Sequence, residues 1–210
     1  RHCHLLRRDR PLTICTLLRP TTHVRSITWT ATLTPSSDGE DASNLVRLDN
    51  SGVADSAGNA GSGNTDSNNY AIDTLRPTAS IVVTDSALAA GETSLVTITF
   101  SEAITGLTVD DFSVATGALS SLATADGGIT WTATLTPSSD VEDASNLVRL
   151  DNTGVADSAG NAGSGNTDSN NYAIDTLRPT ASIVVTDSAL AAGETSLVTI
   201  SFSEAVTGLT

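Results

Sequence analysis

The sequence contains no methionine and no lysine, so its ten basic residues are all arginines, and 24 acids outnumber them to give a net charge of −14 at pH 7. Nucleic-acid binding depends on cationic contacts with phosphates. The shortage of positive charge therefore argues against nucleic acid as a partner. The absence of methionine, with a first residue of Arg1, leads us to expect a section of a longer polypeptide.

Cysteine and histidine occur only in the first 26 residues, and residues 27–210 contain neither. The hydroxyl groups of that long stretch thus have no histidine, cysteine or lysine to activate them as nucleophiles. Paired acids such as Asp110 and Asp111 have the composition of a glycosidase site, but adjacent acids in the loops of a small domain are more typical of solvated or cation-binding groups. We expect no enzyme activity.

Long apolar runs are also missing. None approaches the roughly 18–20 residues of a membrane-spanning helix, so the sequence predicts no membrane span.

The sequence does contain a long internal repeat. Residues 27–108 recur as residues 129–210 at an offset of 102, and 78 of the 82 aligned positions are identical. A period near 100 residues is too long for a helical solenoid and matches the common size of a folding domain. The chain is therefore a tandem array of domains. The four differences pair Gly39 with Val141, Ser51 with Thr153, Thr99 with Ser201, and Ile104 with Val206.

The repeat boundary falls at Ile-Asp-Thr-Leu-Arg-Pro-Thr, residues 72–78 and 174–180, because proline interrupts strand pairing there. This predicts the C-terminal part of one repeat at 27–75, a complete repeat at 76–175 and the N-terminal part of another at 176–210. Residues 1–26 match no part of the repeat and hold six arginines against one acid. Two interpretations of that segment stay open, a basic cap or linker and a reading-frame or gene-prediction error.

The complete repeat shows the two-residue periodicity of half-buried β-strands. Apolar Val96, Ile98 and Phe100 alternate with Leu95, Thr97 and Thr99, and residues 129–136 alternate in the same way around Trp131. We expect Trp131 to anchor the core, with Ile129 and Ala133 beside it. Further strands are expected at 80–84, 107–109, 112–115, 147–150 and 172–174, and residues 86–90 form one helical turn at most. Short strands separated by Gly, Asp, Asn and Ser predict an antiparallel β-sandwich.

Oxygen-bearing side chains are concentrated near the ends of the expected strands. Residues 151–171 contain 12 Gly, Asn or Asp among 21 positions, which suits either a flexible turn-rich loop or a site for calcium, which prefers oxygen ligands. In sandwich order, Glu102 follows the second strand, while Asp157 and Asn161 precede the last one. Both loops would then lie at the end that faces the linker carrying Asp73. The sequence predicts a junctional metal site from these four residues, and Asp175 and Glu204 repeat the pattern at the next junction.

Residues 27–210 resemble the tandem bacterial immunoglobulin-like repeats of large surface adhesins and biofilm-associated proteins. The resemblance rests on five segments: PTASIVV, TSLVTITFSEAITGLT, ITWTATLTP, GVADSAGNAG and NNYAIDT. It implies an Ig-like all-β sandwich that extends an adhesive tip from a secreted or surface-held protein, with neighbouring repeats as its partners. It also implies calcium at the junctions, held by Asp73 and Asp175 with Glu102, Glu204, Asp157 and Asn161. The linker departs from the family pattern at Arg76 and Arg178, which introduce competing cations.

Three functions follow from these observations. The first is a non-enzymatic stalk stiffened by calcium, in a protein whose cell-surface or matrix ligand is bound by regions outside this sequence. The second is a module whose loops bind a glycan or a host protein, and the third is an accessory domain of a secreted enzyme. The two incomplete repeats add a further expectation. The segments 27–75 and 176–210 leave strand edges unpaired, so the terminal pieces are either disordered or complement one another between chains.

Overall fold

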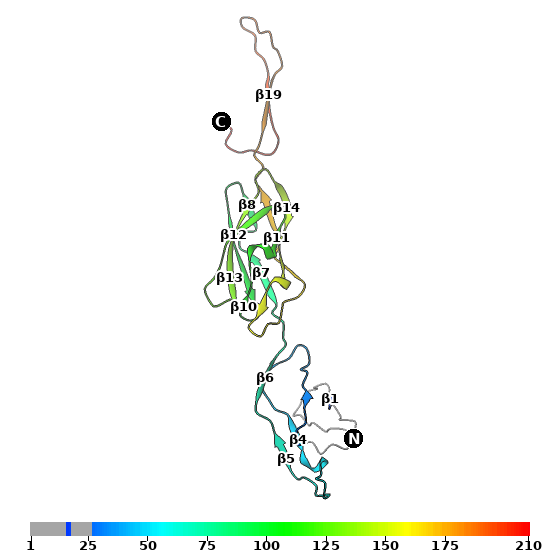
Figure 1. Ribbon diagram of the computed structural model, residues 1–210. Coiled ribbons are helices and arrows are strands. Elements are labelled where there is room, and N and C mark those ends of the chain that lie inside the picture. Colours follow the sequence, from blue (N-terminus) through cyan, green and yellow to red (C-terminus); the bar gives the residue numbers. More distant parts are fainter. Residues whose placement is uncertain (1–15, 18–26) are drawn as a thin grey trace. The chain divides into compact units, whose positions relative to one another are not determined.

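The computed structural model describes residues 16–17 and 27–210 (Figure 1). The expectation for residues 1–26 therefore lies outside the described residues, apart from Thr16 and Leu17, which form β1. The described chain divides into two compact units. The first contains the residues up to Thr78 with Phe100–Leu107 and Asn152–Gly165, and the second contains Ala79–Thr99, Thr108–Asp151 and Asn166–Thr210.

Both units consist of β-strands and short 3-10 turns. The first unit holds β1 (Thr16–Leu17), β2 (Ala31–Thr32), β3 (Glu40–Asn44), β4 (Arg47–Asp49), η1 (Asn50–Gly52), β5 (Asn64–Asp66), β6 (Tyr70–Asp73), β10 (Ile104–Thr105), η3 (Asn152–Gly154) and β16 (Ala156–Asp157). The second holds β7 (Ala79–Val83), β8 (Ala87–Ala89), β9 (Ser94–Phe100, its last residue excepted), η2 (Val109–Asp111), β11 (Phe112–Val114), β12 (Gly117–Thr124), β13 (Thr130–Pro137), β14 (Glu142–Asn146), β15 (Val148–Asp151), β17 (Asn166–Asp168), β18 (Tyr172–Asp175), β19 (Ala181–Val185) and β20 (Val198–Phe202). The all-β Ig-like sandwich predicted from the sequence is confirmed.

Three sheets form the main body of the second unit, with strand orders β12-β13-β9-β7, β14-β18-β8 and β11-β15-β17. The central pairing joins β9 to β13 in antiparallel register, with Trp131 opposite Ile98 and Ala133 opposite Val96. Alternation within β9 buries Val96, Ile98 and Phe100 and leaves Leu95 exposed. The period-two pattern therefore determines which face of this sheet packs into the core.

The complete repeat buries fifteen apolar side chains. Its buried hydrophobic residues are Ile81, Val83, Leu88, Val96, Ile98, Phe100, Ile104, Leu107, Ala133, Leu135, Val148, Leu150, Val155, Tyr172 and Ile174.

One expected strand is absent. Residues 107–109 form no strand, because Thr108 and Asp111 make a capping box that begins the 3-10 turn η2, in which the Asp111 carboxylate accepts a hydrogen bond from the Thr108 backbone N–H at 2.7 Å. Residues 86–90 were expected to form one helical turn at most, and they form none. Instead, Ala87–Ala89 form β8, which pairs in parallel with β18.

Trp131 is only half-buried, so it is not the main anchor of the core. Its indole Nε1 donates a hydrogen bond to the Gly128 carbonyl at 3.1 Å, which keeps one edge of the ring near the β12–β13 turn. Ile129 is exposed. The inward alternation of β13 therefore begins at Ala133 and continues to Leu135, both fully buried.

Candidate metal centre

Asp157 lies at the end of β16 and organises the loop that follows it. Its Oδ1 accepts hydrogen bonds from the backbone N–H groups of Ala159 (2.9 Å) and Asn161 (2.8 Å), and its Oδ2 accepts from Asn161 Nδ2 (2.8 Å). The backbone reverses at Gly160, whose φ of 92° favours glycine. Burial raises the pKa of the Asp157 carboxyl, but the hydrogen bonds from Asn161 and from the 159 and 160 N–H groups outweigh it and lower the pKa overall.

The same loop recurs at Asp55, the counterpart of Asp157 in the first partial repeat. Asp55 Oδ1 accepts from the N–H groups of Ala57 (2.9 Å) and Asn59 (2.8 Å), and Oδ2 accepts from Asn59 Nδ2 (2.8 Å). Asp55 is exposed, whereas Asp157 is buried. The loop conformation is therefore encoded by its own five residues and does not depend on the surrounding repeat.

Glu102 follows β9 and is half-buried. Desolvation raises the pKa of its carboxyl, and the negative charges of Asp157, Asp73 and Glu40 raise it further. A carboxylate in this position is thus repelled by its neighbours and incompletely solvated.

Asp73 is the last residue of β6 and is half-buried. Its Oδ1 accepts a hydrogen bond from the backbone N–H of Leu75 at 3.3 Å, which holds the side chain beside the start of the linker. In the β3–β6 pairing, Asp73 lies opposite Glu40.

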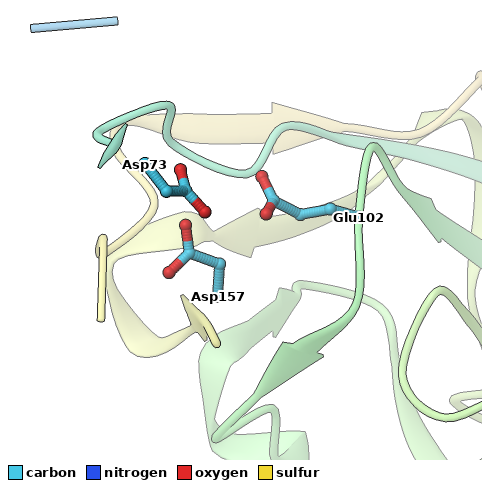
Figure 2. Close-up of side chains that lie close together, drawn as sticks. All are labelled: Asp73, Glu102 and Asp157. Atoms are coloured by element: carbon cyan, nitrogen blue, oxygen red, sulfur yellow. The ribbon is translucent and has the colours of Figure 1, made fainter. Parts of the chain in front are cut away.

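The carboxyl groups of Asp73, Glu102 and Asp157 converge, and one oxygen from each lies within 4.8 Å of the others. Figure 2 shows the three groups directed toward a common point from three different segments of the chain. All three residues belong to the first compact unit. Each contributes carboxylate oxygens, the ligands that calcium prefers, so the donor set fits a hard divalent cation.

Asn161 connects two of these acids. Its Nδ2 donates to Asp157 Oδ2 at 2.8 Å, to Asp73 Oδ1 at 3.3 Å and to the Asp73 carbonyl at 3.2 Å. The structure therefore brings together four predicted residues. It gives Asn161 the role of orienting the carboxylates through its amide N–H groups.

Asp175 and Glu204 do not form an equivalent cluster. Both are exposed, and Asp73, Glu102 and Asp157 make the one group of three potential ligands found in the described part of the chain. The last loop of the third repeat, which would supply the counterpart of Asp157, is not part of the sequence. The counterparts of Asp73 and Glu102 are thus not sufficient to form the cluster without that loop.

Sequence reasoning missed Glu40, which adds a fourth negative charge near Glu102. No sequence signal pointed to it, because its place follows from the β3–β6 register, in which Glu40 lies opposite Asp73 as its counterpart Glu142 lies opposite Asp175 in β14–β18. Arg76 was expected to compete with a metal ion. Its Nη1 donates to the Ala162 carbonyl at 2.8 Å, which ties the linker to the loop that contains Asn161.

A family model described as a bacterial Ig-like domain matches residues 8–72, 73–174 and 175–210. The first match begins inside the segment 1–26 and the second begins at Asp73. The repeat boundaries inferred from the sequence alone stay a prediction. Neither the search of curated proteins nor the search of solved structures gave a match.

Within the described residues, no helix has the length and apolar character needed to cross a bilayer.

Proposed function

The chain belongs to the bacterial Ig-like domain family, and on this basis we propose that its repeats are non-enzymatic extenders of a large secreted or surface-attached bacterial protein that supports cell adhesion or biofilm formation. The acidic, cysteine-free composition of residues 27–210 supports an extracellular location. Antibodies against the complete repeat should label intact cells of the source bacterium without permeabilisation. Labelling that requires permeabilised cells would contradict this location.

We further propose that calcium binds at Asp73, Glu102 and Asp157. The observation that supports this is the convergence of their carboxyl groups within 4.8 Å. Like charges at such distances repel one another, more strongly where burial lowers the local dielectric constant. A divalent cation would convert this repulsion into attraction.

The donor set favours calcium over zinc or copper. It contains carboxylate oxygens, whereas those metals prefer the imidazole and thiolate groups that residues 27–210 lack. Calcium takes six to eight oxygen ligands, including carbonyls and water. Asp73, Glu102 and Asp157 would hold the ion, and Asn161 would orient the two aspartates.

The proposed mechanism is mechanical. Asp73 belongs to β6 in the first partial repeat, whereas Glu102 and Asp157 belong to the complete repeat. An ion bound by all three would restrict the motion of the linker between consecutive repeats. The hydrogen bond from Arg76 to the Ala162 carbonyl would act in the same direction without an ion.

Calcium titration of the full chain by calorimetry, together with thermal melts in calcium and in chelator, tests the proposal. If calcium binds only the folded state, a free calcium concentration of about 100 times Kd should raise the free energy of unfolding by about 2.7 kcal/mol. Asp157→Asn should abolish most of this gain. Asp55→Asn is the matched control, because it changes the same loop where Glu102 and Asp73 have no counterparts nearby.

Two results would contradict calcium binding at this site. One is a melt that calcium does not shift. The other is an equal loss of calcium response in the Asp55→Asn and Asp157→Asn variants, which would indicate a non-specific effect of acidic loops.

A further inference from the structure

One of the three main sheets of the second unit carries no charge. Its strands β12, β13, β9 and β7 contain no Asp, Glu or Arg, and the chain has no lysine. In the other two sheets, β14, β15, β17 and β18 each contain at least one charged residue. The chain as a whole has a net charge of −14 at pH 7. This sheet is therefore an exception on an acidic molecule.

The outward residues of these four strands form what we call the neutral face. Since Val96 and Ala133 point into the core, the residues that alternate with them point out. Thr132 of β13 lies opposite Thr97 of β9 and opposite Ala123 of β12. Hydroxyl and small apolar groups thus cover the face. It further includes Ser80, Val82, Leu95, Thr99, Thr130 and Thr134.

The neutral face exposes two large apolar side chains. Val82 on β7 is 54% exposed, and Leu95 on β9 is 52% exposed. Single exposed apolar residues are common on folded proteins. Here the two lie on neighbouring strands, among side chains without charge. An uncharged patch of this kind is typical of an interaction site.

The aromatic residues of this sheet do not point outward. The four strands contain two, Phe100 and Trp131. Phe100 is 3% exposed, and Trp131 lies opposite the fully buried Ile98, so both belong to the inner side. Sites for small molecules are concave and usually lined by aromatic side chains. The neutral face therefore fits a broad protein surface better than a small sugar.

The charge distribution selects a second copy of this chain as the partner. A basic partner would be attracted to the acidic sheets, and two acidic surfaces repel one another. Two copies that meet through their neutral faces bring no strand carboxylate of these sheets into contact. Their hydroxyl groups can exchange hydrogen bonds, and Val82 and Leu95 become buried.

The size of the sheet makes this contact a weak one. Four strands about 4.8 Å apart, with β13 eight residues long, cover about 19 Å by 27 Å, or about 500 Å² for each copy. A total near 1,000 Å² is typical of weak, transient complexes. The uncharged positions recur in the neighbouring repeats, so several such contacts can act together between two arrays. The counterparts of Ser80, Val82, Leu95 and Thr97 are Ser182, Val184, Leu197 and Thr199.

We propose that the neutral face of the complete repeat binds the neutral face of a second copy of the chain. The contact is isologous, because both copies contribute the same surface. Chains of this type therefore associate side by side through weak contacts, one for each repeat. This association needs no metal ion, so it is independent of the calcium site.

Sedimentation of the full chain in chelator tests the association. The average mass should rise above that of a monomer as the concentration increases. Added salt should strengthen the association, because it screens the repulsion between the acidic surfaces. Association that appears only in calcium would overturn the proposal, since it would indicate bridging through carboxylates.

A matched pair of substitutions locates the contact. Leu95→Asp and Val82→Asp place a charge on the neutral face and should weaken self-association by about tenfold or more. Leu147→Asp is the control. Leu147 is 40% exposed and lies between β14 and β15, so the same change in net charge occurs outside this sheet. Thermal melts establish that each variant is folded before its association is compared.

Cross-linking gives a second measurement without a charge on the face. In a Cys3→Ser, Cys15→Ser background, Leu95→Cys chains treated with a flexible bis-maleimide should form more covalent dimer than Leu147→Cys chains. Three further results would overturn the proposal. They are a monomer at every concentration, an equal loss of association in Leu95→Asp and Leu147→Asp, and equal dimer yields from the two cysteine variants.

Discussion

Asn161 donates its side-chain amide to both the carbonyl and the carboxylate of Asp73, at 3.2 and 3.3 Å. This contact links the last loop of the complete repeat to the end of β6, 88 residues earlier in the chain. Removal of the amide by Asn161→Ala should lower calcium affinity by roughly tenfold or more, the usual effect of losing a group that orients metal ligands. Calorimetric titration measures the change. Asn59→Ala, which alters the equivalent loop residue of the first partial repeat, should leave the affinity unchanged.

Glu102→Gln should have opposite effects with and without calcium. The Glu102 carboxylate is desolvated and lies near three other acids, which is also why its pKa is raised. In chelator the substitution removes this repulsion, so the variant should melt at a higher temperature than the native chain. In saturating calcium it removes a ligand, so the gain from calcium should shrink. A variant less stable than the native chain in both conditions would indicate a purely structural role.

Asp126 should control part of the acid sensitivity of the complete repeat. Its carboxylate accepts hydrogen bonds from the backbone N–H groups of Thr130 (2.8 Å) and Ile129 (3.2 Å) and from the Thr124 hydroxyl (3.1 Å), which lowers its pKa from 3.8 to about 2. A lowered folded-state pKa contributes stability above pH 3.8 that is lost as the pH falls toward 2.

Thermal melts between pH 2 and pH 5 measure this contribution. Asp126→Ala should be less stable than the native chain at pH 5, and the difference should shrink toward pH 2. Position 126 has no counterpart in the other repeats, so the effect reports on the complete repeat. Asp110→Ala is the control, since Asp110 precedes β12 in the chain whereas Asp126 follows it. If the stability difference between Asp126→Ala and the native chain stays constant across the pH range, the titration of Asp126 is excluded as its cause.

Leu135→Ala should destabilise the complete repeat by about 2–5 kcal/mol, because Leu135 is fully buried and the substitution leaves a cavity. Leu33→Ala makes the same change at the same repeat position, where the side chain is largely exposed. At low protein concentration it should leave the main melting transition unchanged. Denaturant titration of both variants gives the comparison, and equal losses would mean that Leu33 is buried in solution.

The strands with strong alternation were predictable because burial on one face selects apolar residues at every second position. The pattern of Val96, Ile98 and Phe100 gave β9 in this way. β14 was not predicted, since its sequence Glu-Asp-Ala-Ser-Asn has little strand propensity and forms through its pairing with β18. Trp131 was misjudged for a related reason. Alternation predicts a face but not how far along a strand the core extends.

The candidate site could be predicted to the extent that strand order determines which loops lie at the same end of the sandwich. That argument placed Glu102 near Asp157 and Asn161, and the structure brings them together with Asp73. It could not show that Asn161 orients the carboxylates instead of acting as a ligand beside them, because the direction of an amide group depends on its local hydrogen bonds. Nor could it identify Glu40, whose proximity follows from the β3–β6 register.

The division of the core between the two ends of the repeat has a consequence for the order of folding. The β9–β13 ladder joins Ser94–Thr99 to Thr130–Leu135, so neither end buries its apolar face before the other has been synthesised. During synthesis, each incomplete repeat therefore has an exposed strand beside a neighbour of almost the same sequence. Tandem arrays are prone to pairing between the wrong repeats in such a period. The four differing positions include no buried core residue except Ile104, so the sequence provides almost no discrimination, and the order of emergence of the chain has to supply it.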